Sequence, residues 1–354
     1  MLAPVFLLAC FGLFSVLSAT LGKYQLTYFL KQLGFLGLGL IVFFVAGNIN
    51  WRFFKNEGKS LLIIFGASLI LLLGLFFFGT EIRGAQSWYR FGFFNFEPVE
   101  LVKIVLVLIL AKYFSWRHVE MFSPKHVGVS FLYVLLPLGL VLLQPDLGSA
   151  IILGAIWLAL VLLAGIKPKH LLAVILLAII FGALAWHFVL VDYQKQRITS
   201  FLDPGRDPYG SSYNLLQALI SVGSGGFWGK GFGQGGQTQL GFLPESHSDF
   251  IFASLAEELG FFGCLTIFTL YFFFFFRLTV LSRQMPNNFS RLVLLGFASM
   301  FLAEFFINVG MNIGLLPITG IPLPFLSYGG SSLVASFLAL GIVGGLVSRR
   351  QPVV

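Results

Sequence analysis

The chain has 354 residues, of which 58% are hydrophobic and only 10% are charged. Soluble domains carry about 25% charged residues, so this composition excludes a soluble globular protein and predicts an integral membrane protein. The two cysteines lie inside apolar runs, which argues against a disulfide framework and a cysteine metal site. The net charge of +8 is spread over short segments, without the basic patch typical of nucleic-acid binding.

Long apolar runs recur along the whole chain. A membrane-spanning helix needs about 17–25 mostly apolar residues, and about ten runs meet that need. We therefore expect an all-α polytopic membrane protein, built as a single integral membrane domain over residues 1–354. The first run lacks the basic start and cleavage site of a signal peptide, so it should be a retained helix. The expected spans are residues 3–21, 29–47, 60–79, 99–114, 127–143, 150–166, 171–190, 250–276, 292–313 and 328–347.

Basic residues cluster in alternate short segments between these spans. The positive-inside rule therefore predicts that both termini lie in the cytoplasm, as an even number of spans requires. Most carboxylates fall in the other set of segments or at their helix ends, so the polar chemistry is expected on the outer face. The inward-facing basic residues are Arg52, Lys55, Lys59, Lys112, Arg117, Lys125, Lys167, Lys169, Arg277, Arg283, Arg291, Arg349 and Arg350.

The segment 191–248, between the seventh and eighth spans, is too long for a simple connector and should form a large extracytoplasmic loop. Its first part, around Arg197 and on through residues 201–204 and 207–210, is typical of turns, and residues 211–222 have helical spacing. Residues 223–236, the glycine loop, follow. Such glycine density allows either a mobile loop or a close backbone approach to a ligand. A dinucleotide-binding fingerprint is excluded, because no strand precedes the glycines and no helix follows them.

Residues 243–252 bring titratable groups to the start of an apolar span. An ionisable group at a membrane boundary is costly unless it has a partner or a purpose, so Asp249 is a candidate general base. The alternative is a helix N-cap, since Ser248 or Asp249 precedes the apolar run. Glu245 and His247 are candidate substrate-binding neighbours, although a lone loop histidine is more often simply solvated.

Glu100 and Lys103 lie three residues apart at the outer end of a predicted helix and can therefore pair. Lys103 could serve as the cation for an anionic substrate with Glu100 orienting it, or the two could form a structural ion pair. The aromatic residues 88–98 before them suggest an interfacial or re-entrant segment.

Other polar residues have both a structural and a functional interpretation. Asp146 fits a turn or helix cap, or a substrate contact. Arg197 and Lys230 could bind phosphate or be solvated loop charges. Carboxylates within spans should face protein or water inside the bundle rather than lipid; these are Glu257, Glu258 and Glu304. Three prolines within residues 317–332 block a continuous helix, so this proline segment should be an ordered turn.

Three motifs together resemble the SEDS family (shape, elongation, division and sporulation proteins), and the resemblance covers nearly the whole chain. They are residues 243–260, residues 322–332 and residues 144–148. Residues 311–322, with Gly229-Lys-Gly231 and Gln237-Thr-Gln239, are more similar to the elongation branch, RodA-like, than to the division branch, FtsW-like.

The resemblance implies a peptidoglycan glycosyltransferase that polymerises lipid II on the outer face of the bacterial cytoplasmic membrane. It implies that Asp249 is the catalytic aspartate and that Glu100 and Lys103 are the family's important pair. One departure is that Glu97 stands where the family usually has glutamine, in Glu97-Pro-Val-Glu100. A class B penicillin-binding protein and other cell-elongation proteins are the implied partners.

The chemistry expected of such an enzyme needs a base and a cation. Asp249 would take the proton of the acceptor 4-hydroxyl as it attacks the donor sugar with inversion. The leaving diphosphate would be neutralised by Lys103, Arg197 or a divalent metal such as Mg²⁺ or Mn²⁺. Two other classes stay open: a lipid II flippase with Glu257, Glu258 and Glu304 along a polar path, and a membrane scaffold for a cell-wall complex.

Overall fold

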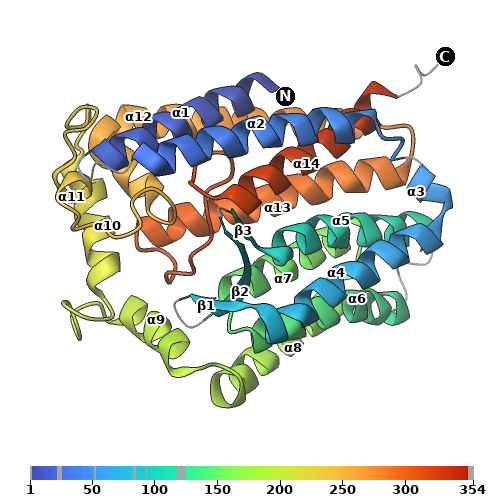
Figure 1. Ribbon diagram of the computed structural model, residues 1–354. Coiled ribbons are helices and arrows are strands. Elements are labelled where there is room, and N and C mark those ends of the chain that lie inside the picture. The colour runs from blue at the N-terminus through green and yellow to red at the C-terminus, as the bar shows by residue number, and fades with distance from the viewer. Residues whose placement is uncertain are drawn as a thin grey trace. The chain divides into compact units, whose positions relative to one another are not determined.

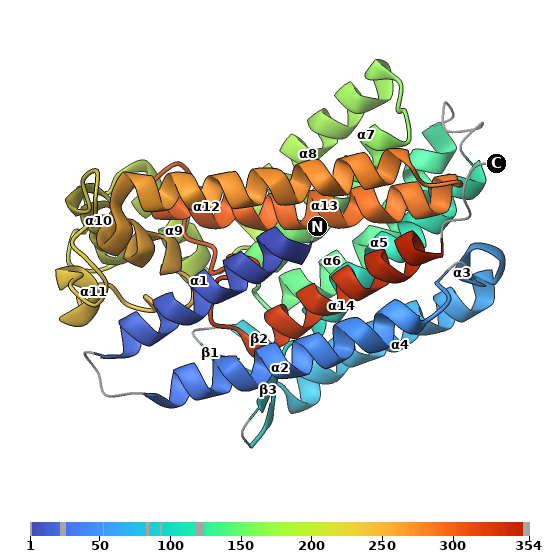
Figure 2. The ribbon, with the colours of Figure 1, turned by 90° about the horizontal axis from the view of Figure 1, so that it is seen from above.

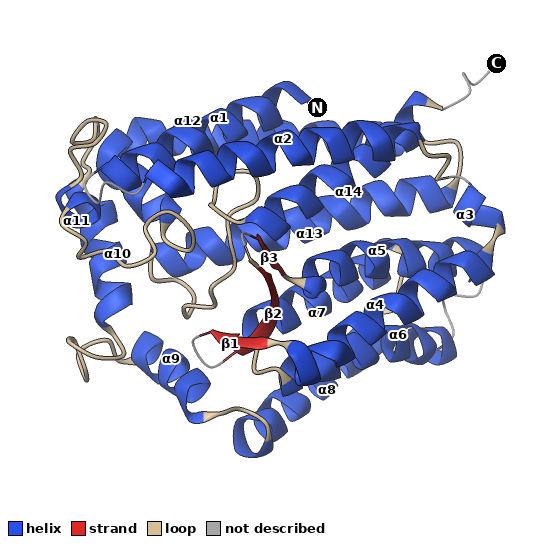
Figure 3. Cartoon of the chain, viewed as in Figure 1, coloured by secondary structure: helices blue, strands red, loops and turns tan. Residues whose placement is uncertain are grey.

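The computed structural model describes residues 2–21, 26–51, 53–82, 85–92, 94–117 and 124–349. Helices make up most of this part of the chain, with one small sheet (Figure 3). Arg52 and Arg350, which contribute to the predicted orientation, lie outside the described residues.

A helix lies at the position of each expected membrane span. Within the described residues, eight of these helices are long and apolar enough to cross a membrane. The other two, α5 and α7, fall outside that criterion because α5 carries several charges and α7 has 17 residues. The ten helices are α1 (Leu2–Leu21), α2 (Leu26–Asn48), α4 (Gly58–Phe78), α5 (Pro98–Arg117), α6 (Pro124–Leu143), α7 (Leu147–Leu163), α8 (Pro168–Phe188), α12 (Ile251–Arg283), α13 (Asn288–Asn312) and α14 (Gly330–Ser348).

The chain divides into two compact units. Unit 1 consists of Met1–Val42, Gln196–Leu278 and Glu304–Phe337, and unit 2 of Phe43–Lys195, Thr279–Ala303 and Leu338–Val354. The long helices α2, α12, α13 and α14 each contribute residues to both units. In Figure 1 the green helices α5, α6, α7 and α8 belong to unit 2, whereas the yellow segment with α10 and α11 belongs to unit 1.

Unit 2 is built around α5. Helices α4, α6 and α7 all pack on it, and every residue from Val102 to Ala111 is buried. The two views in Figures 1 and 2 show α4, α5, α6 and α7 side by side. A short helix, α3 (Phe53–Asn56), precedes α4. Helix α8 differs from its neighbours because none of its residues is buried, so its apolar surface is available to lipid.

Residues 80–96 form a three-stranded antiparallel sheet, which the sequence analysis did not predict. Its strands are β1 (Thr80–Ile82), β2 (Ala85–Phe91) and β3 (Phe94–Phe96). Tyr89 pairs with Phe96 and Phe91 with Phe94, so four aromatic rings share one face of the hairpin. Aromatic residues at alternate positions favour a strand. The segment is thus a β-hairpin, and its interfacial or re-entrant location stays a prediction.

The sheet is fastened to α4 by a tyrosine. The Tyr89 hydroxyl donates to the Leu71 carbonyl at 2.8 Å, and partial burial raises the pKa of this phenol. Gly74, one turn further along α4, leaves room for the same hydroxyl. The hairpin therefore stands at the end of the α4–α5 pair, directly before Glu100 and Lys103.

The long loop contains three helices. These are α9 (Asp192–Leu202), α10 (Tyr213–Ser224) and α11 (Gly236–Gln239). The helix expected at residues 211–222 is confirmed as α10. The expectation of turns around Arg197 is wrong, because this residue lies on α9, while the turns at 203–212 are present. There the Asp207 carboxylate accepts the Ser211 backbone N–H at 2.8 Å, which lowers the pKa of Asp207.

The glycine loop is inserted into helix α12. Gly260 has non-helical angles, φ 64 and ψ −161, which break the hydrogen-bond ladder of this helix. In a regular helix the N–H groups of Phe261 and Phe262 would donate to the carbonyls of Glu257 and Glu258. They donate instead to Gly226 and Phe227 at 2.9 and 3.2 Å. The two freed carbonyls accept from Lys230 and Gly231, each at 3.0 Å.

The glycines are needed because two backbones meet at this insertion. A Cβ atom on Gly225 or Gly229 would overlap a carbonyl group of α12, and one on Gly260 would overlap the Gly229 amide. Gly229 and Gly260 also have φ values of 79 and 64, which favour glycine. The glycine density therefore serves a close backbone approach, but the partner is helix α12 of the same chain.

Candidate active site

Asp249 lies in a tight turn, residues 245–250, directly before α12. Glu245 has a left-handed φ of 47, and its carbonyl accepts the N–H groups of Ser248 and Phe250 at 3.1 and 3.2 Å. The Ser248 hydroxyl also donates to the Glu245 carboxylate at 3.0 Å. Phe250 is buried, while Asp249 stays partly exposed. The Asp249 turn thus holds a partly exposed Asp249 carboxylate directly before the buried Phe250.

The proline segment holds the Asp249 turn from one side. The Tyr328 N–H donates to the His247 carbonyl at 2.8 Å, and the Ser327 hydroxyl donates to the Ser248 carbonyl at 2.7 Å. Gln32 of α2 donates in turn to the Ser327 carbonyl at 3.1 Å. The expected ordered turn at residues 317–332 is confirmed, and its last part serves to fix the residues before Asp249.

Two buried asparagines of α13 hold the turn from the other side. The side-chain amides of Asn308 and Asn312 both donate to the Asp249 backbone carbonyl, at 3.0 and 3.1 Å. Asn308 also donates to the Ile321 carbonyl at 2.8 Å. The sequence analysis missed these residues. Two amides one helical turn apart inside an apolar span are the signal that could have found them.

The Asp249 carboxylate faces the proline segment at Gly320. A Cβ atom on Gly320 would lie 3.6 Å from Asp249 Oδ2, and Gly320 has a φ of 79. Arg197 of α9 donates to the neighbouring Ile318 carbonyl at 3.5 Å. The predicted base and one predicted cation therefore flank the same stretch of backbone.

His247 is packed among aromatic rings. Its ring centroid lies 4.6 Å from that of Tyr28 and 5.4 Å from that of Tyr328. Its Nε2 lies 4.0 Å from the Glu245 carboxylate. Burial, and to a lesser extent the proximity of Tyr28, raises the pKa of the Tyr328 phenol. His247 and Glu245 are thus parts of the framework around Asp249, and a contact with substrate stays a prediction.

Lys230 is paired with a carboxylate of α12. Its Nζ lies 2.7 Å from Glu257 Oε1, and the fully buried Glu257 also accepts the N–H groups of Gln237 and Thr238 at 3.0 and 3.2 Å. Glu257 therefore ties the glycine loop and α11 to α12. The structural interpretation of Glu257 is favoured, and a phosphate contact of Lys230 stays a prediction.

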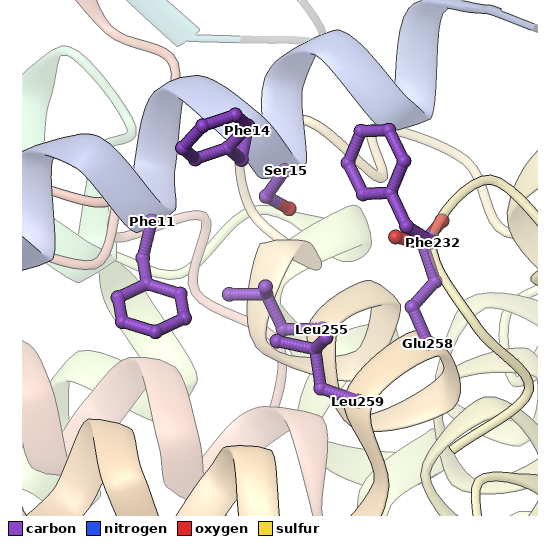
Figure 4. Close-up of a pocket in the computed structure, with 7 residues that line it drawn as sticks. All are labelled: Phe11, Phe14, Ser15, Phe232, Leu255, Glu258 and Leu259. Carbon is purple, nitrogen blue, oxygen red and sulfur yellow. The ribbon is translucent and has the colours of Figure 1, made fainter.

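Glu258 faces an apolar cavity between α1, α12 and the glycine loop (Figure 4). Its carboxylate accepts a hydrogen bond from Ser18 of α1, whose hydroxyl in turn accepts the Gly233 N–H at 3.1 Å. The cavity has a volume of about 170 Å³ and is lined by Phe11, Phe14, Ser15, Phe232, Leu255, Glu258 and Leu259. Glu257, Glu258 and Glu304 are all buried, as expected of carboxylates within spans.

The remaining predicted site residues belong to unit 2. Lys103 Nζ lies 2.9 Å from Glu100 Oε2, and both side chains are buried, which confirms the expected pair. Asp146 is the N-cap of α7, since its Oδ1 accepts the Ser149 N–H at 3.0 Å. Tyr193 and Gln194 at the start of α9 both donate to the Pro145 carbonyl, at 2.6 and 2.8 Å. These contacts favour structural roles, and substrate roles stay predictions.

Comparison with known proteins decides the family. The model of the FtsW, RodA and SpoVE proteins, described as a cell cycle protein, matches residues 1–351. This chain belongs to the FtsW/RodA/SpoVE family. The SEDS resemblance of its motifs is thereby confirmed.

Family members from several branches are similar to this chain. The peptidoglycan glycosyltransferase MrdB of Escherichia coli K12 is 36% identical over 91% of this chain and 86% of MrdB. A probable peptidoglycan glycosyltransferase FtsW of Thiomicrospira cyclica is 36% identical over 96% of this chain and 88% of its own length. Stage V sporulation protein E of Bacillus subtilis is 34% identical over 95% and 93%.

Solved family structures share the fold. A chain of a peptidoglycan synthase complex, studied for the coordination of polymerization and crosslinking, has a TM-score of 0.83 and 31% identity, covering 99% of this chain and 98% of that one. The rod shape determining protein RodA of Thermus thermophilus has a TM-score of 0.71 and 30% identity, covering 99% and 97%. The chain is therefore a multi-pass membrane protein with the SEDS fold.

A divalent cation is one of the expected partners of the leaving diphosphate. Among the described residues, no group of three or more His, Cys, Asp and Glu side chains lies close enough together to hold a metal ion. Because Mg²⁺ is usually held by one or two carboxylates together with substrate phosphates, a divalent cation at the leaving diphosphate stays a prediction.

Proposed function

We infer that this protein is a peptidoglycan glycosyltransferase that polymerises lipid II into glycan strands for cell elongation. Its similarity to MrdB and FtsW proteins supports the activity, and its similarity to MrdB and to the rod shape determining protein RodA supports the elongation role. The observation that carries the assignment of the site is the partly exposed Asp249 carboxylate, held beside Gly320 on a backbone fixed from both sides.

Asp249 acts as the general base in this proposal. The acceptor 4-hydroxyl oxygen forms a bond to the anomeric carbon of the donor as the bond from that carbon to the lipid diphosphate breaks. The hydroxyl proton passes to the Asp249 carboxylate, and the diphosphate leaves with the bonding electron pair. Such general-base assistance typically contributes a factor of about 10²–10⁴ in rate. Attack from the face opposite the leaving group inverts an α-linked donor and gives a β-linked glycan.

The leaving diphosphate needs a cation, and Arg197 is the stronger candidate. Arg197 is partly exposed and donates to the Ile318 carbonyl, within the segment that Asp249 faces. Lys103 is 1% exposed and engaged with Glu100, so its contribution would need that pair to open. Arginine is also the better partner for a phosphate, because its planar group donates two hydrogen bonds at once.

The site is proposed to lie on the outer face of the bacterial cytoplasmic membrane, with both termini in the cytoplasm. The distribution of basic residues between the spans supports this orientation. A class B penicillin-binding protein is the proposed partner, since one similar structure comes from a complex that coordinates polymerization with crosslinking. The exposed Phe272, Phe273 and Phe276 of α12 are available to such a partner or to lipid.

Replacing Asp249 by asparagine tests the base. Asp249→Asn is expected to abolish glycan polymerisation by purified protein in detergent while the thermal melting curve and lipid II binding stay unchanged. Asp203→Asn is the matched control, because Asp203 is an exposed carboxylate of the same long loop, and it should polymerise normally. Normal polymerisation by Asp249→Asn would disprove the base. Lipid II translocation in vesicles without any polymer in detergent would identify a flippase instead.

A further inference from the structure

Asn312 caps the first turn of helix α12, where the N–H groups have no partner within the helix. If α12 began one residue earlier, the Ala253 N–H would donate to the Asp249 carbonyl, four residues before it. Here the Asn312 side-chain amide lies between them: its Nδ2 donates to the Asp249 carbonyl at 3.1 Å, and its Oδ1 accepts the Ala253 N–H at 3.2 Å. Because the Ala253 N–H can only donate, the atom of the Asn312 side chain that faces it must be the oxygen Oδ1 rather than the nitrogen Nδ2.

Asn308 completes the arrangement. Its Nδ2 donates to the Asp249 carbonyl at 3.0 Å and to the Ile321 carbonyl at 2.8 Å, while its Oδ1 lies 3.3 Å from Asn312 Nδ2. Both asparagines are completely buried. The two amides therefore join three backbone segments: the Asp249 turn, the start of α12, and the proline segment just after Gly320.

This joint sets the position of the Asp249 carboxylate. An aspartate side chain has only two rotatable bonds, so fixing its backbone carbonyl restricts where its oxygens can lie. The Ile321 carbonyl, held by the same Asn308 amide, belongs to the residue after Gly320, which the carboxylate faces. Without Asn312, the Ala253 N–H and the Asp249 carbonyl could bond directly and draw Asp249 into the helix, away from Gly320.

We propose that Asn308 and Asn312 are positioning residues for glycan polymerisation, which hold the Asp249 turn out of helix α12 so that its carboxylate can reach the acceptor hydroxyl. The inference rests on the proposed function of Asp249 as the base. Neither asparagine touches substrate. Their effect is on geometry, and a displacement of about 1 Å in such a group can lower a rate by about 10²-fold.

The test compares turnover with substrate binding in Asn312→Ala, Asn312→Ser and Asn308→Ala. We expect kcat for polymerisation to fall by about 10-fold or more per folded protein, while KM for lipid II changes by less than about twofold. Hydrogen exchange of the Ala253 amide should also change in the Asn312 variants, since its acceptor is lost. Ser130→Ala is the control: it removes the buried hydroxyl of unit 2 that accepts the Trp157 indole N–H, and it should leave kcat unchanged.

The outcomes separate this inference from the proposed function. If Asp249→Asn is inactive and the folded asparagine variants turn over normally, the positioning role is overturned and the base survives. If Asp249→Asn polymerises normally, the base and its positioning residues are both overturned. A fall of activity that only follows the folded fraction, or failure of both Asn312 variants to fold, would show that the pair is purely structural and would also overturn the inference.

Discussion

Helix α12 is contacted by other segments at two places, its N-terminus and the Gly260 kink, and the comparison of the two separates function from folding. At the N-terminus of α12, the Asn312 side-chain amide donates to the Asp249 carbonyl and accepts the Ala253 N–H. At Gly260 the backbone of the glycine loop bonds two carbonyls and two N–H groups of α12. Next to the Asn312 contact, Asp249 stays partly exposed beside Gly320. Next to the glycine loop, Glu257 and Glu258 are buried. The asparagine amide therefore shapes the candidate site around Asp249, whereas the inserted glycine loop is tied to α12 and serves the fold.

The largest effect on stability is expected from Gly260→Ala. Its Cβ atom would overlap the Gly229 amide and the Phe227 carbonyl, and alanine at a φ of 64 is strained in addition. We expect a loss of about 2–4 kcal/mol, measured by thermal unfolding in detergent, with polymerisation lost in parallel. Gly182→Ala, at an open position of α8, should instead be neutral or slightly stabilising. An unchanged melting temperature for Gly260→Ala would show that the insertion does not hold the fold.

A smaller loss is expected from Glu257→Gln. The buried carboxylate accepts from Lys230 and from the N–H groups of Gln237 and Thr238. In glutamine, an NH₂ group replaces one carboxylate oxygen, so its two N–H bonds would face groups that can only donate. A buried group that loses its partners costs about 1–3 kcal/mol, which the same melting experiment would detect. Full stability with full activity would mean that α11 and the glycine loop are held without this carboxylate.

Lys230→Met should have the smallest effect. The Lys230 side chain is 36% exposed, so water screens its pair with Glu257, and the carboxylate keeps its other donors. We expect a loss below about 1 kcal/mol and polymerisation within a few-fold of the wild type. If kcat falls strongly in a stable Lys230→Met protein, Lys230 contacts the substrate, which is one of its two interpretations from the sequence, and the insertion at Gly260 contributes to catalysis as well.

Hydropathy was sufficient to predict the ten long apolar helices, because a run of apolar residues of that length can cross a membrane wherever its partners lie. The features that were missed depend on distant partners. The exception is the β1–β3 sheet, whose strands pair within residues 80–96 and whose alternating aromatic residues are a local signal. The glycine loop bonds to residues such as Phe261 and Phe262, far along the chain. Tyr193 and Gln194 fasten the start of α9 to the Pro145 carbonyl in the same way.

The charged residues of the candidate site were predicted from the sequence, whereas the uncharged residues that hold them were not. Asp249, Glu245 and His247 stand out because they are titratable residues at the end of an apolar run. Asn308 and Asn312 carry no charge, and their role follows only from the carbonyl that they share. The pairing of Lys230 with Glu257 was also outside the reach of the sequence, since 27 residues separate the two.

The inserted glycine loop has a consequence for protein engineering. Its four hydrogen bonds to α12 fix its length, so one added residue would shift every partner by one position. Chimaeras between relatives should therefore exchange the glycine loop and the Gly260 kink together. The exposed turn at Gly205 and Arg206, which makes no such ladder, is the better place for an affinity tag or a fluorophore.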